Sequence, residues 1–181
     1  MKFLLYLLPL ILMISHCRNK EEKYITMFPG KPEIPSSIKD EHELLLEQMR
    51  TFTLFQDRTG QMALKLDSLL KHHFQEEEDF VLPPLGYLPL LASGEMPEQH
   101  NEVIQLTQKL KSQLAHMSAE HQLIKAYMNE LKQAADHDNH HEIIEFEKQL
   151  HKHANTEEEV FFPAALLVGK YLKLKSEPVQ K

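Results

Sequence analysis

Two short segments of the sequence each carry a histidine followed four residues later by a glutamate, His73 with Glu77 and His153 with Glu157. On a helix, two residues at this spacing project from the same face, one turn apart. Imidazole nitrogens suit iron, zinc and copper, and a carboxylate can bridge two cations. Each pair therefore predicts part of a transition-metal site, although a single pair of this kind also occurs on ordinary solvated helix faces.

Both pairs belong to an internal duplication. Residues 70–85 (LKHHFQEEEDFVLPPL) align with residues 150–166 (LHKHANTEEEVFFPAAL), and both segments run from the His–Glu pair through further acidic residues to a proline. Residues 38–49 (IKDEHELLLEQM) align with residues 117–128 (MSAEHQLIKAYM), because each has a Glu-His dipeptide followed by apolar residues at helical spacing. The pattern predicts two copies of one helix–helix unit.

The duplication selects the metal ligands. In each copy the first helix adds one histidine to the His–Glu pair of the second helix. Unpaired carboxylates inside an apolar bundle would cost on the order of several kcal/mol each, so inward-facing glutamates require a cation beside them. The predicted metal ligands are His42, His73, Glu77, His121, His153 and Glu157.

Other residues with similar spacing do not repeat. His72 and Glu76 also lie four residues apart, but the aligned positions of the second copy hold a lysine and a threonine, so the duplication argues against this pair. His116 falls on a different helix face from the predicted ligand five residues later. Glu41 and Glu120 each precede a predicted ligand histidine. We expect both to be solvated or first-turn residues, with a contact to a ligand histidine as the alternative.

The expected secondary structure is entirely helical. The composition favours helix, because the chain has only 5 glycines and no tryptophan and is rich in Leu, Glu, Lys and Gln. The pattern predicts two antiparallel hairpins packed as an all-α, up-down four-helix bundle, with a long connection over residues 83–96. Pro83 and Pro163 are expected to end the second helix of each hairpin. The predicted helices span residues 37–56, 61–82, 97–135 and 140–162, with a short final helix over residues 164–175.

The N-terminus carries a different kind of signal. Residues 1–17 combine Lys2, an apolar run and Cys17, the only cysteine, directly before a polar segment. The run is too short to span a bilayer as a lone helix, and the arrangement resembles a bacterial lipoprotein signal peptide, in which the cysteine is lipidated and becomes the mature N-terminus. We therefore expect a membrane-anchored lipoprotein of the bacterial cell envelope. The alternatives are an uncleaved N-terminal anchor or a secreted or periplasmic protein.

Together these features divide the chain into four parts. The net charge of −7 and the lack of a basic patch argue against a nucleic-acid partner. A single cysteine allows no internal disulfide. The predicted parts are a signal peptide (residues 1–17), a linker (residues 18–37), a metal-binding bundle (residues 38–166) and a partly helical C-terminal tail (residues 167–181).

The pattern His…His-x3-Glu…His…His-x3-Glu, with a proline after each acidic cluster, resembles the hemerythrin-like (HHE cation-binding) family over about residues 38–166. The resemblance implies a non-haem di-iron centre held by the six residues above, with an oxo bridge between the two iron ions; another divalent metal is the alternative. It also implies that the protein binds or senses a small diatomic ligand, oxygen or nitric oxide, or handles iron. The second hypothesis is a di-iron enzyme or iron-centre repair factor, with peroxidase, nitric oxide reductase or repair activity.

Overall fold

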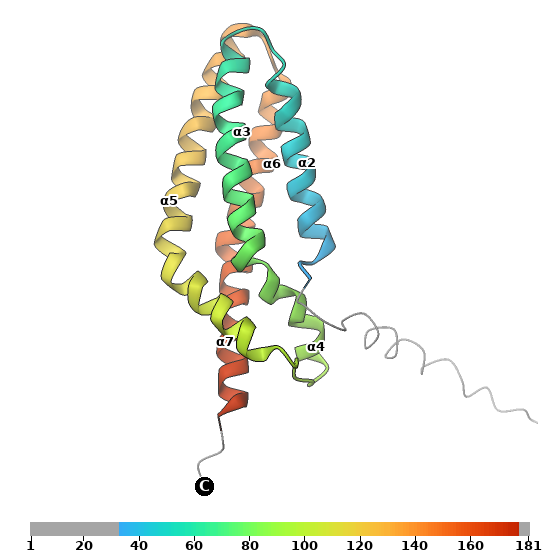
Figure 1. Cartoon of the computed structure of the whole chain (residues 1–181). Coiled ribbons are helices and arrows are strands. Elements are labelled where there is room, and N and C mark those ends of the chain that lie inside the picture. Colours follow the sequence, from blue (N-terminus) through green and yellow to red (C-terminus); the bar gives the residue numbers. More distant parts are fainter. Residues whose placement is uncertain (1–32, 178–181) are drawn as a thin grey trace, which may run out of the picture.

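The bundle is formed by four long helices that run alternately up and down (Figure 1). The computed structural model describes residues 33–177, and every regular element in that range is helical. The helix α3 packs against both α2 and α5, and α6 packs against both α5 and α2. This arrangement confirms the predicted all-α, up-down four-helix bundle. The four helices are α2 (Ser36–Phe52), α3 (Arg58–Glu76), α5 (His100–Asp138) and α6 (Glu142–Thr156).

The second helix of each hairpin ends in a π-helical turn, η1 (Glu77–Val81) after α3 and η3 (Glu157–Phe161) after α6. In each turn a backbone N–H donates to the carbonyl of a glutamate five residues earlier. Leu82 donates to Glu77 at 2.9 Å, and Phe162 donates to Glu157. Single π turns inside α-helices are rare and occur often at functional sites. The sequence-based prediction treated both segments as regular helix and missed the turns.

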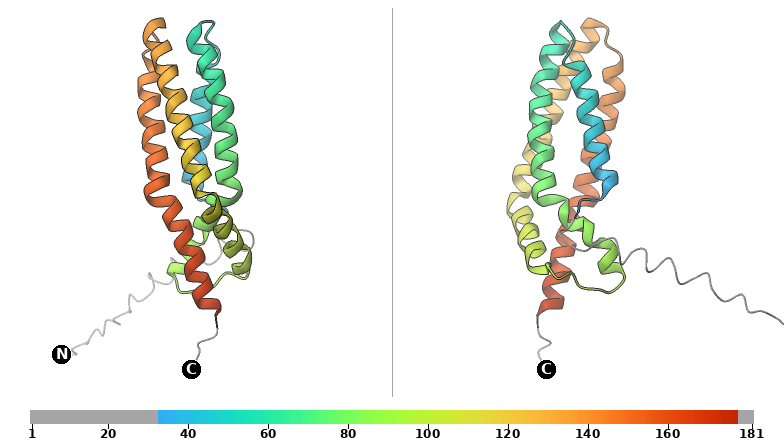
Figure 2. Two further views of the ribbon diagram at one scale, coloured as in Figure 1. Left: turned by 90° about the vertical axis from the view of Figure 1, so that its left-hand side faces the viewer. Right: turned by 45° about the vertical axis from the view of Figure 1, so that its right-hand side comes forward.

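The two hairpins differ after their π turns. Following η1, the chain forms a 3₁₀ helix, η2 (Pro83–Tyr87), and then the short helix α4 (Leu88–Ala92). Following η3, the chain continues directly into α7 (Phe162–Ser176), so that α6, η3 and α7 form one continuous helical segment (Figure 2). The prediction that Pro163 ends a helix is therefore wrong. Pro163 lies in the first turn of α7, where its missing N–H is not needed.

Several helix ends also differ from the predicted ones. The helix α2 ends at Phe52, before the predicted end. The helix α3 begins earlier than predicted because the side chain of Asp57 caps it, accepting a hydrogen bond from the Gly60 N–H at 3.1 Å. The helix α5 runs through the predicted turn to Asp138 and ends at Asn139, which has a left-handed φ of 64°. Asparagine is one of the residues that tolerates this conformation, which terminates helices.

Besides a small third cluster where η2, α5 and α7 meet, the apolar core of the described residues has two larger clusters, with a polar layer between them. One cluster lies toward the hairpin turns and includes Leu45, Leu70 and Ile124. The other lies toward the π turns and includes Val81 and Met117. All of these side chains are buried. The histidines predicted as ligands lie between these clusters along the helices, so the fold surrounds them with apolar side chains on both sides.

Some predictions fall on parts of the chain that the structure does not describe. The signal peptide, the lipidated Cys17 and the linker up to residue 32 lie outside the described residues. The predicted division at residue 166 falls inside α7. Among residues 33–177, no helix is both long enough and apolar enough to cross a bilayer.

Candidate metal centre

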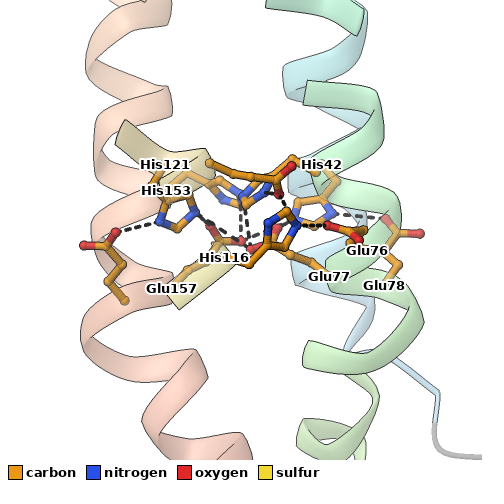
Figure 3. A network of polar contacts seen from close by, with 11 residues as sticks. His42, Glu76, Glu77, Glu78, His116, His121, His153 and Glu157 are labelled. Carbon is orange, nitrogen blue, oxygen red and sulfur yellow. Dashed lines mark hydrogen bonds and ion pairs between the residues drawn. The ribbon is translucent and has the colours of Figure 1, made fainter. Parts of the chain in front are cut away.

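The six predicted ligands meet in one buried layer of the bundle. Glu77 and Glu157 begin the two π turns, which point both carboxylates inward, and both residues are fully buried. The histidines come from four different helices, one each, and none is more than 1% exposed. Figure 3 shows the imidazoles of His42, His121 and His153 arranged around the two carboxylates. The structure therefore brings together the complete set, namely His42, His73, Glu77, His121, His153 and Glu157.

The donor atoms of this layer form two groups that share both glutamates. In each group, one nitrogen or oxygen from each of four residues lies within 4.8 Å of the others, a spacing that can hold a metal ion. Each group takes one histidine from each hairpin, so neither hairpin forms half of the site alone. The groups are His42, Glu77, His153 and Glu157, and His73, Glu77, His121 and Glu157.

In all four histidines, Nε2 faces the shared carboxylates. His153 Nε2 lies 3.0 Å from Glu157 Oε1, and His73 Nε2 lies 3.4 Å from Glu77 Oε1. His42 Nε2 is 3.5 Å from Glu157 Oε1 and 3.6 Å from Glu77 Oε2. His121 Nε2 is 3.5 Å from Glu157 Oε2.

A carboxylate lies beside the Nδ1 atom of each histidine. Three of these contacts are hydrogen bonds: 2.7 Å from His121 to Glu158, 2.9 Å from His73 to Glu120 and 3.0 Å from His42 to Glu78. Glu41 lies 3.5 Å from His153 Nδ1, an ion-pair distance without hydrogen-bond geometry. A carboxylate at Nδ1 fixes the proton on that nitrogen and leaves the Nε2 lone pair free, which is the usual arrangement of a metal-binding histidine.

Several buried nitrogen and oxygen atoms of the site have no hydrogen-bond partner within residues 33–177, and a bound metal ion would interact with them directly. Both carboxylate oxygens of Glu77 and the Nε2 atoms of His73, His121 and His153 are buried without a hydrogen-bond partner among the described residues. Buried polar atoms are nearly always satisfied, and leaving one unsatisfied costs about 1–3 kcal/mol. Since imidazole nitrogens and carboxylate oxygens are also the donors that iron and zinc prefer, the residues present fit a transition metal.

The titration of these groups reflects their burial and their mutual contacts. Burial and the neighbouring Glu157 raise the pKa of Glu77 well above its ordinary value. Burial acts in the same direction on Glu157, but contacts with the surrounding histidines outweigh it and hold the pKa of Glu157 well below its usual range. Burial lowers the pKa of His73. Burial also acts to lower the pKa of His121 and of His153, but the neighbouring carboxylates together outweigh it, Glu157 with Glu158 at His121 and Glu157 with Glu41 at His153, and raise both pKa values. The layer therefore retains protons that a bound cation would displace.

Sequence reasoning identified the six clustered residues but not all of the carboxylates that contact them. Glu78 and Glu158 were visible only as repeated acidic residues, and this repetition was the signal that could have identified them. The expectation that Glu120 is solvated is wrong, because its side chain is only 11% exposed and bonds to His73. Glu41 is 45% exposed and fits the expectation in part.

Comparison with known proteins identifies the family of this chain. Searches of curated proteins and of solved structures gave no match. The hemerythrin HHE cation binding domain matches residues 33–165, a stretch that includes all six clustered residues and both π turns. The chain belongs to the hemerythrin HHE cation binding domain family.

Proposed function

We propose that the buried layer holds two iron ions, one in each four-residue group, and that Glu77 and Glu157 are shared by both ions. The observation that carries this proposal is the pair of donor groups with two carboxylates in common. A carboxylate can bridge two cations, and imidazole suits iron better than it suits magnesium or calcium. Two divalent ions would also compensate the two carboxylates, which are fully buried.

We further propose that the protein binds or senses oxygen or nitric oxide. Each group supplies four donors, fewer than an octahedral ion takes, so the ion pair would provide open positions for a small diatomic ligand. The chain's own residues orient the histidines through their Nδ1 contacts. The aromatic rings of Phe74 and Phe162 stack on His42 and His121, with ring centroids 4.1 Å and 5.8 Å apart, and keep bulk water from these two imidazoles.

The place of action that we propose is the bacterial cell envelope, with the bundle attached to the membrane through a lipidated Cys17. This proposal rests on the N-terminal sequence alone, in which the only cysteine lies shortly after the apolar run. It favours gas binding, gas sensing or iron handling over repair of intracellular iron centres.

Gas titration of the iron-loaded full chain tests this function. The protein is reconstituted anaerobically with Fe²⁺ and titrated with oxygen or nitric oxide while its optical spectrum is recorded. Reversible spectral changes at one ligand per iron pair support a binding protein. Consumption of the gas with turnover would instead support the enzyme hypothesis, and the lack of any spectral response in protein with two irons per chain would contradict both.

A further inference from the structure

A second cluster of metal-ligating side chains lies where α3 meets α5, outside the buried layer. It consists of two further His-x3-Glu pairs, His72 with Glu76 on α3 and His116 with Glu120 on α5. The spacing places both members of each pair on one helix face. Because α3 and α5 pack directly against each other, the two pairs meet across the seam between the helices. We call these four residues the outer cluster.

The donor atoms of the outer cluster converge. One atom each from His72, Glu76 and Glu120 lie within 4.8 Å of one another. His116 Nε2 lies 3.0 Å from Glu76 Oε2 and 3.7 Å from Glu120 Oε2, and Figure 3 shows it next to the buried layer. Two ligands of a tetrahedral zinc ion are about 3.4 Å apart, given metal–ligand distances of about 2.1 Å. Three of the donors therefore already lie at a spacing that can hold an ion, and His116, which contacts both carboxylates, has to shift toward His72 to complete the set.

The outer cluster is open to solvent on one side. The side chain of Glu120 is 11% exposed, that of Glu76 is 28% exposed and that of His116 is 45% exposed. His72 is also exposed. A cation could therefore enter from solvent without opening the bundle, and the two carboxylates would balance its charge. The innermost member, Glu120, also bonds to His73 of the buried layer, so the two sites share a side chain.

The internal duplication indicates that the buried layer does not need this cluster. Aligning the two copies places Glu41 opposite Glu120, and both lie beside a buried histidine. The positions opposite His116, His72 and Glu76 are serine, lysine and threonine. In the other half of the site a carboxylate still lies beside the histidine without the three additional donors, at 3.5 Å rather than in a hydrogen bond of 2.9 Å. A carboxylate can therefore reach the buried histidine without them.

We infer that the outer cluster binds one divalent transition-metal ion of the zinc type, as a third metal site beside the buried pair. The competing explanation is a set of surface His–Glu ion pairs, which contribute little to stability. The inference does not depend on which metal occupies the buried layer or on which gas binds there.

Equilibrium dialysis of the iron-loaded full chain against Zn²⁺, with zinc and iron measured together, tests the inference. We expect one zinc per chain in addition to the iron, with the iron content and optical spectrum unchanged. In the double variant His72→Ala/His116→Ala, zinc affinity should fall more than about 100-fold, a larger loss than removal of supporting partners causes. His151→Ala, which removes a histidine from α6 on the other half of the bundle, is the matched control and should change zinc affinity less than twofold.

The inference is overturned if the iron-loaded protein binds no additional zinc, or if the double variant and the control bind it equally. Iron content, measured in the same samples, reports separately on the buried layer.

Discussion

Replacing Glu158 by glutamine should weaken metal binding at the buried layer without disturbing its packing. The Glu158 side chain accepts the shortest of the Nδ1 contacts, 2.7 Å from His121. A glutamine oxygen can still accept this hydrogen bond, so Glu158→Gln removes the negative charge and little else. Losing such a partner typically costs 10- to 100-fold in metal affinity, which is about 1.4–2.7 kcal/mol.

The structure also predicts a smaller effect at Glu41 than at Glu158. Glu41 lies 3.5 Å from His153 without a hydrogen bond and is 45% exposed, so solvent screens its charge. We therefore expect Glu41→Gln to lower metal affinity less than about fivefold, since exposed charge pairs contribute at most about 1 kcal/mol. Glu159 follows Glu158 in the same π turn but is exposed, which makes Glu159→Gln the matched control.

Competition with a chelator measures these differences. His121 belongs to only one of the two donor groups, so Glu158→Gln should make metal removal biphasic, with one ion lost at 10- to 100-fold lower chelator concentration than in the wild type. Glu159→Gln should give the wild-type curve. If Glu158→Gln and Glu159→Gln give the same curve, the Nδ1 carboxylates do not support the metal ligands and the reasoning is refuted.

Three further predictions concern the fold away from the site. Leu66→Ala should destabilise the bundle by about 2–5 kcal/mol in urea unfolding because the side chain is fully buried, whereas Leu64→Ala on the same helix, 56% exposed, should change stability by less than about 0.5 kcal/mol. Gly169→Ala should cost about 1–3 kcal/mol by the same assay, since its added methyl group would collide with the Thr107 side chain on α5; an unchanged midpoint would contradict the close packing of α7 on α5. Asp57→Asn keeps the helix cap but removes the ion pair that raises the pKa of His140. The free energy of unfolding should therefore fall at pH 6, where His140 is charged, and match that of the wild type at pH 9. An equal loss at both pH values would contradict this.

The buried layer was predictable because its signal is local and repeated. A histidine and a glutamate four residues apart share a helix face whatever the tertiary structure, and the second copy removed the ambiguity between His73 and His72. The same logic identified His42 and His121 from their common Glu-His dipeptide. Helix periodicity and the repeat together were sufficient for the all-α bundle.

The π turns and the supporting contacts could not be derived in this way. A π turn adds one residue to a helix over only five positions, a stretch too short for the apolar period to distinguish it from regular helix, so the segments after Glu77 and Glu157 looked like regular helix. Pro163 looked like a stop signal because proline has no N–H to donate, although it lies in the first turn of α7. The contact from Glu120 to His73 joins two hairpins and depends on how they pack, which no local spacing encodes.

In our proposal the buried layer holds two iron ions between two shared glutamates. Elemental analysis of the full chain, after anaerobic reconstitution with Fe²⁺ and removal of loosely bound metal, counts these ions directly. We predict two irons per chain in the wild type and less than one in Glu77→Ala/Glu157→Ala, the variant that removes both shared carboxylates. One iron or none in the wild type, or two irons retained in that variant, would contradict the account.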